Sequence, residues 1–220
     1  MASIFSISDN TDERKLLNRA LLLSVITIVY NLIEGVVSMY FGMDDESLAL
    51  FGFGADSFVE VISGLGILHL ILRMKRHGTV DRRDSFERTA LRITGTAFYL
   101  LTAGLLAGSV LRAIDGSAPE TTIVGVIVSA LSIATMYALL KAKLAVGHAL
   151  KSDAVIADAN CTRTCYYLSI ILLASSGLYE LFGIGWFDTL GSLGIAWFAF
   201  SEGRESFQKA RSGDLACACD

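Results

Sequence analysis

The stretch "LALFGFGADSFVEVISGLGILHLIL", residues 48–72, places two carboxylates inside an otherwise apolar run. The run is longer than the roughly 20 residues that an α-helix needs to cross a hydrocarbon core of about 30 Å. Asp56 and Glu60 are four residues apart, so on a helix they project from one face, one turn from each other. Ionisable groups are costly inside a membrane span and mark a pathway, a binding site or a structural pair. The stretch therefore predicts a membrane helix with a functional polar face.

The composition of the whole chain agrees with this interpretation. Of 220 residues, 53% are hydrophobic and 18% charged, and the mean hydropathy is +0.56. A soluble domain of this length is usually more charged and less apolar. One proline and 20 glycines favour helices that pack closely. The first 19 residues lack the basic start, apolar core and cleavage site of a signal peptide, so we expect them to stay attached.

Reading the chain for apolar runs of this length predicts an all-α, polytopic membrane protein with six transmembrane helices. The predicted spans are residues 16–41, 48–72, 90–114, 121–144, 155–182 and 186–200. Of the 18 lysines and arginines, all but Arg112 and Arg163 lie in, or within four residues of, the two terminal segments and the connections after spans two and four. The positive-inside rule then places both termini in the cytoplasm. We divide the chain into a cytoplasmic tail (1–15), a six-helix transmembrane domain (16–206) and a short cytoplasmic tail (207–220).

The fifth predicted span begins with a second polar segment, "VIADANCTRTC", residues 155–165. Cys161 and Cys165 have the same spacing of four as the span-two carboxylates, and Asp158 joins their face. If spans two and five face each other, two carboxylates and two thiols converge within the membrane. Four such ligands form the tetrahedral cage that Zn²⁺ prefers, and thiolates favour borderline and soft ions. The pattern predicts a metal site built from Asp56, Glu60, Cys161 and Cys165.

Each polar residue also has a structural explanation. A cysteine in an apolar helix is more often a small core residue than a ligand, whereas adjacent buried carboxylates repel each other unless a cation or protons neutralise them. The acidic pair is therefore the stronger signal. Asn31 and Glu34 are explained equally by hydrogen bonds to neighbouring helices, and Asp188 by capping of the sixth helix. Possible secondary or pathway residues are Asn31, Glu34, Asp158, Asp188, Cys217 and Cys219.

With these motifs in place, the chain resembles the transmembrane part of the cation diffusion facilitator family. The resemblance is carried by "SLALFGFGADSFVEVISG" (47–64) and "FDTLGSLGIAWFAFSEG" (187–203), and it covers about residues 20–210. It implies that Asp56 and Glu60 occupy the acidic pair of span two, and that Cys161 and Cys165 replace the histidine and aspartate of span five. Because thiols replace that pair, the usual zinc or manganese selectivity is not simply inherited. We also expect a short member without the cytoplasmic C-terminal domain.

The resemblance implies a secondary transporter rather than an enzyme, with no cofactor. The expected cargo is Zn²⁺, or Cd²⁺ or another soft or borderline divalent ion, exported from the cytoplasm by metal/proton antiport with alternating access. Four ionised ligands would exceed the charge of a divalent ion, so we expect at least one to keep a proton and metal binding to release protons. Expected partners are the metal ion, protons, membrane lipid and a second copy in a homodimer through the transmembrane domain. No nucleic-acid partner is expected, and the expected location is the cell (inner) membrane, as a multi-pass protein.

Two other functions stay open at this point. A membrane thiol oxidoreductase would use Cys161 and Cys165 as a redox pair, but such pairs usually lie two residues apart at a helix N-terminus. Their spacing of four argues against it. A metal-binding sensor or accessory protein without transport is compatible with every residue in the sequence, and only a flux measurement separates it from a transporter.

Overall fold

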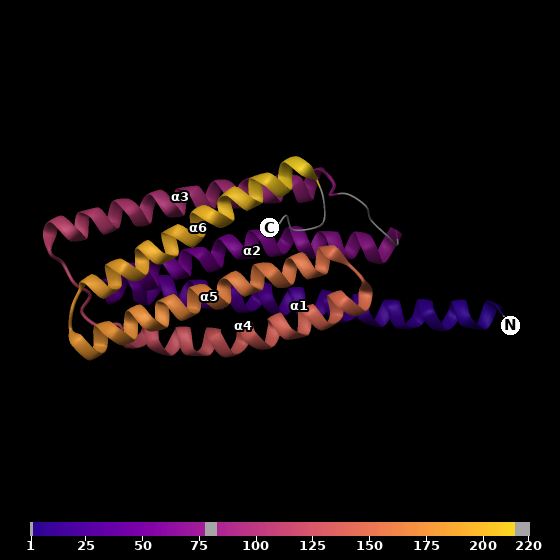
Figure 1. Cartoon of the computed structure of the whole chain (residues 1–220), viewed down its shortest axis with the longest axis horizontal. Coiled ribbons are helices and arrows are strands. Elements are labelled where there is room, and N and C mark those ends of the chain that lie inside the picture. Colours follow the sequence, from indigo (N-terminus) through magenta and orange to yellow (C-terminus); the bar gives the residue numbers. More distant parts are fainter. Residues whose placement is uncertain (1, 78–82, 214–220) are drawn as a thin grey trace.

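The computed structural model describes residues 2–77 and 83–213, and the side chains of residues 14–76 and 83–213. Over these ranges the regular structure is entirely helical (Figure 1). The helices are α1 (Ala2–Asp44), α2 (Leu48–His77), α3 (Ser85–Asp115), α4 (Ile123–Leu150), α5 (Asp153–Phe182) and α6 (Trp186–Ser212). The predicted all-α class is confirmed. Cys217 and Cys219 lie outside the described residues.

Five of these helices, α1 to α5, are long and apolar enough to cross a membrane by length and composition. Helix α6 is not among them, and its second half carries Glu202, Arg204 and Glu205. It nevertheless packs lengthwise along α3. The start of α1 and the end of α6 lie at the same end of the bundle (Figure 1). The polytopic membrane class is confirmed, while a sixth crossing by α6 and the side that the termini face stay predictions.

The helices extend beyond the predicted apolar spans. Helix α1 begins at Ala2, within the predicted tail 1–15, and α2 continues to His77 rather than ending near residue 72. A helix satisfies its own backbone hydrogen bonds in lipid and in water alike, so hydropathy marks only the part that lipid surrounds. The division into a tail, a membrane domain and a second tail stays a prediction.

The bundle is organised by three long helix pairs: α1 packs on α2, α3 on α6 and α4 on α5. Helix α2 also contacts α3, α5 and α6 and is therefore central. The largest buried apolar cluster joins α2, α3, α4, α5 and α6, and it consists of Ala49, Leu50, Phe53, Leu105, Val128, Leu168, Leu172, Ile195 and Ala196. Phe53 belongs to this cluster and lies one turn before Asp56 on α2, so the α2 carboxylates follow directly after the packed core.

Two glycines allow the close helix contacts. A Cβ on Gly42 of α1 would lie 2.5 Å from the backbone nitrogen of Phe51 in α2. A Cβ on Gly191 of α6 would lie 2.2 Å from Ser175 Oγ of α5. Small residues let membrane helices approach closely enough for dispersion contacts to hold them together. The α1–α2 and α5–α6 hairpins therefore depend on the absence of a side chain at these positions.

Asp188 ties three helices together at the end of the bundle opposite the chain termini. Its carboxylate is fully buried and accepts hydrogen bonds from Ser47 Oγ (2.6 Å) and from the backbone N–H groups of Leu48 (2.9 Å) and Ala49 (3.3 Å). Arg112 of α3 donates to the same carboxylate at 2.8 Å. The N-cap of α6 is Gly185, without a side-chain hydrogen bond. The expectation that Asp188 caps its own helix is wrong, because it caps the start of α2.

Candidate metal centre

Glu60 is the point where α2 meets α5. Cys165 Sγ of α5 donates a close hydrogen bond to Glu60 Oε2, and Asn31 Nδ2 of α1 donates to the same oxygen at 3.1 Å. Cys165 and Asn31 are 4% and 1% exposed, respectively. The structure therefore brings one carboxylate and one thiol of the predicted set together, with the thiol buried and Glu60 half-buried.

Asp56 lies one turn before Glu60 on the same face of α2. It is 3% exposed, and its Oδ1 atom has no hydrogen-bond partner among the described residues. A buried carboxylate oxygen without a donor is unfavourable unless a cation or a proton occupies the position beside it. The pair Asp56 and Glu60 has the chemistry of a divalent cation site, and the thiol of Cys165 adds a softer donor.

Cys161 has a different environment from Cys165. It is half-buried, and its Sγ lies 4.0 Å from Lys209 Nζ of α6. Residues four apart on a helix differ by about 40° in direction, which is enough to direct the two thiols toward α6 and α2 respectively. Among the residues with described side chains, Asp56, Glu60, Cys161 and Cys165 do not form a group with all donor atoms within 4.8 Å. The four-ligand cage stays a prediction.

The two polar residues predicted on α1 both make hydrogen bonds to α2. Asn31 donates to Glu60, and Glu34 Oε2 accepts from Ser57 Oγ at 3.1 Å. Glu34 is 7% exposed, and within the described part of the chain its Oε1 atom has no hydrogen-bond partner. Helix α1 therefore adds another buried carboxylate to the region around Asp56. Their interhelical bonds account for both residues structurally, and a role in an ion pathway stays a prediction.

A small cavity, with a volume of about 40 Å³, adjoins Glu60 and Cys161. That volume is sufficient for a water molecule. The lining also includes Glu202 of α6, Lys143 of α4 and Asp158 of α5, of which the sequence analysis selected only Asp158. Lys143 was counted among the basic residues near the connection after span four, which the positive-inside rule explains. Position 143 falls inside the predicted span 121–144. A lysine within a predicted membrane span was therefore the sequence signal that could have marked Lys143 as a functional residue.

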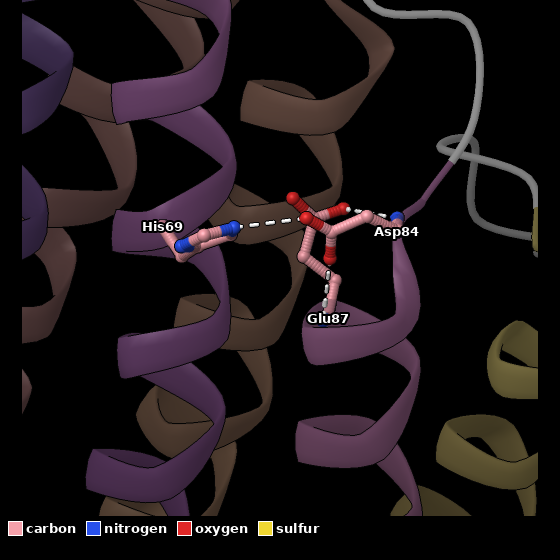
Figure 2. A group of neighbouring side chains, drawn as sticks. All are labelled: His69, Asp84 and Glu87. Carbon is pink, nitrogen blue, oxygen red and sulfur yellow. Dashed lines mark hydrogen bonds and ion pairs between the residues drawn. The ribbon is translucent and has the colours of Figure 1, made fainter.

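A second polar cluster joins α2 to the start of α3 (Figure 2). His69 Nε2 of α2 is 2.9 Å from Asp84 Oδ2, and Asp84 forms a capping box with Glu87 at the start of α3. In the part of the chain with described side chains, these are the one group of three or more His, Cys, Asp or Glu residues whose donor atoms all lie within 4.8 Å of one another. We refer to them, with Arg73, as the α2–α3 polar cluster.

Arg73 determines how this cluster is interpreted. Its guanidinium lies 3.3 Å from Asp84 Oδ2 and 3.2 Å from Glu87 Oε2, so both carboxylates already have a cation beside them. Burial alone would raise the pKa of Asp84. The hydrogen bonds from the Glu87 backbone and His69, together with the charge of Arg73, outweigh burial and lower that pKa. An ionised Asp84 held by Arg73 makes the cluster a structural link between α2 and α3.

One family comparison covers most of the chain. The cation efflux transmembrane domain matches residues 20–213, which is nearly all of the bundle. No curated protein matches the chain at a significant level. Proteins of the matching family are transporters and not enzymes. Such proteins transport divalent metal cations, and the long apolar helices of this bundle fit an integral membrane protein. The chain belongs to the cation efflux, or cation diffusion facilitator, family.

Proposed function

We propose that the protein exports Zn²⁺, or a softer divalent ion such as Cd²⁺, from the cytoplasm across the cell (inner) membrane in exchange for protons. The observation that carries the proposal is the contact between Glu60 of α2 and Cys165 of α5, beside the buried Asp56. The ion is bound by Asp56, Glu60 and Cys165, with Cys161 as the fourth ligand after its side chain turns from α6. A mixed oxygen and sulfur donor set suits borderline ions better than Mg²⁺ or Mn²⁺.

Proton exchange follows from the charge of the ligand set. Two carboxylates and two thiolates would carry four negative charges against two positive charges on the ion. An excess of two negative charges away from water is strongly unfavourable, so at least one ligand keeps its proton in the loaded site and more do so in the empty site. Metal binding therefore displaces protons. Alternating exposure of the site to the two sides of the membrane converts this displacement into antiport.

Flux measurements on purified protein in liposomes test the proposal. Zn²⁺ or Cd²⁺ is added outside, and a pH-sensitive dye and a metal-sensitive dye report from inside. Metal entry with proton movement in the opposite direction is expected. Metal movement without proton movement refutes the antiport, and metal binding without any flux indicates a sensor or accessory protein instead.

Variants test the ligand set. Asp56→Asn should abolish transport of every ion, and Cys165→Ser should lower Cd²⁺ affinity at least tenfold and Zn²⁺ affinity less. Ser175→Ala is the matched control, because Ser175 is a buried hydroxyl ten residues further along α5 and donates to the backbone carbonyl of Phe187 instead of the site. It should change either affinity by less than about threefold. Normal transport by Asp56→Asn would mean that the site lies elsewhere.

The environments of the two thiols do not favour the redox alternative. Cys165 donates to Glu60, whereas Cys161 lies beside Lys209, so the two sulfurs have different neighbours. We also propose a homodimer through the transmembrane helices, supported by the family relationship. A detergent-corrected mass equal to one 23.7-kDa chain would refute the dimer without affecting the transport proposal.

A further inference from the structure

Two lysines line the cavity beside Glu60, although a divalent cation is expected to pass nearby. These are Lys143 of α4 and Lys209 of α6. An ammonium group repels a metal ion, and a lysine inside a membrane span is costly unless it has a partner or a function. The position of Lys143 therefore calls for an explanation in terms of the transport site.

Lys143 is held by two residues of α5. It is 2% exposed, and its Nζ atom lies 3.1 Å and 3.0 Å from the two carboxylate oxygens of Asp158. The hydroxyl of Thr162 lies 2.9 Å from the same nitrogen. These partners place a positive charge on the α5 surface that also carries the proposed thiol ligands.

The distance from this charge to the site follows from helix geometry. Thr162 and Asp158 precede Cys165 by three and seven residues on α5, which corresponds to about 5 Å and about 10 Å along the axis. The ammonium group that contacts both residues is therefore within one or two turns of the Glu60–Cys165 contact. Glu60 and Lys143 line the same cavity, so no packed layer of apolar side chains separates them completely.

We propose that Lys143 is a tethered counter-ion of the transport site, and that Asp158 sets how far its charge lies from the bound metal. In the empty site the ammonium group partly offsets the clustered carboxylates. In the loaded site it repels the divalent ion and promotes its release. Lys143 is thus a positioning residue that sets metal affinity and turnover. This inference rests on the proposed site at Asp56 and Glu60.

Coulomb's law makes the effect measurable. At a separation of about 5 to 10 Å and an effective dielectric constant of about 20, a unit charge and a divalent ion interact strongly enough to change an affinity at least tenfold. The two partners of the pair act in opposite directions. Removing the ammonium should tighten metal binding, whereas removing the Asp158 carboxylate leaves an unopposed positive charge and should weaken it.

Metal titration calorimetry in detergent, with Cd²⁺ as the probe, tests this order on four proteins: wild type, Lys143→Met, Asp158→Asn and the neutral pair Lys143→Gln/Asp158→Asn. Lys143→Met should bind Cd²⁺ at least tenfold more tightly than wild type and show slower turnover in liposomes. Asp158→Asn should bind at least tenfold more weakly. The neutral pair should lie between Lys143→Met and wild type, because it removes both charges while its amides retain hydrogen-bonding capacity.

A purely structural ion pair predicts a different result. Both single variants would then weaken binding through loss of fold stability, and the neutral pair would bind like wild type; either result overturns the counter-ion proposal. If the single variants do not fold, the neutral pair decides alone, since binding equal to or weaker than wild type is the contrary outcome. Asp56→Asn distinguishes a failure of the proposed metal site from a failure of the Lys143 role alone. Retained Cd²⁺ binding in Asp56→Asn refutes the proposed site, whereas lost binding with the wrong charge order refutes only the role of Lys143.

Discussion

The carboxylate of Asp188 should be one of the most important single groups for the stability of this bundle. It is fully buried, accepts hydrogen bonds from Ser47 and from the first backbone N–H groups of α2, and pairs with Arg112, whose side chain is 17% exposed. Removing one partner of a buried ion pair costs about 3–5 kcal/mol, because the remaining charge and donors lose their acceptor. Asp188→Ala should therefore lower the free energy of unfolding by about 3–5 kcal/mol. Asp188→Asn keeps one acceptor oxygen and should cost about 1.5–3 kcal/mol.

Thermal unfolding of the purified protein in detergent, followed by circular dichroism, measures this effect. For a chain of this size each kcal/mol corresponds to about 2–4 °C, so Asp188→Ala should lower the midpoint by about 10 °C. Asp115→Asn is the matched control, because Asp115 is an exposed carboxylate at the same end of the bundle, and it should shift the midpoint by less than 2 °C. Adding Arg112→Met to Asp188→Asn should recover part of the loss. A midpoint for Asp188→Ala equal to that of the control would show that the buried network contributes nothing.

Three further predictions concern other parts of the molecule. The pKa of Asp84 is lowered in the fold, so the stability that its charge contributes is complete above the ordinary value of 3.8 and is lost as the pH falls through the lower folded value. Asp84→Asn should therefore be destabilised by less than about 1 kcal/mol at pH 7, and the difference from wild type should shrink as the pH falls through the lowered pKa of Asp84, as melting curves across pH would reveal. Gly42→Val should lower stability by at least 2 kcal/mol in the same melting assay, because even a Cβ would lie 2.5 Å from a backbone nitrogen of α2; an unchanged midpoint contradicts this. Glu34→Gln should preserve the bond from Ser57 and retain metal binding within about threefold by calorimetry, and complete loss of binding would make Glu34 a ligand.

The sequence predicted the helices because membrane spans have a strong and simple signal. Length and hydropathy located all six helices, but not how far they continue: α1 begins at Ala2 and α6 ends at Ser212. Lipid imposes the apolar stretch, whereas the helical backbone continues in water whenever local residues allow it. Hydropathy also does not determine which helices pair most closely, and the structure pairs α3 with α6 and α4 with α5.

The candidate site was predicted in part for a similar reason. Spacing of four placed Glu60 and Cys165 on faces that do meet, but the same reasoning joined Cys161 to them, and the structure puts Cys161 beside Lys209. Two residues four apart on a helix differ by about 40° in direction, so one of them can contact a neighbouring helix while the other contacts a different helix. Lys143 was explained by topology because its partner, Asp158, lies on the next helix. Hydropathy considers each residue alone and therefore places a lysine at the membrane surface. An ion pair with a residue of a neighbouring helix neutralises that charge and allows the lysine to be buried.

The acceptor at position 188 also has a consequence for biogenesis. Helix α2 emerges from the ribosome long before α6. Its first backbone N–H groups therefore lack their native acceptor, the Asp188 carboxylate, until the chain has grown by a further 140 residues. Until α6 arrives, water or lipid headgroups must satisfy that end of α2 and the guanidinium of Arg112. Packing of α6 against the bundle thus supplies the missing acceptor for the start of α2. Chains truncated before residue 188 should lack this acceptor, and quality-control proteases should degrade them.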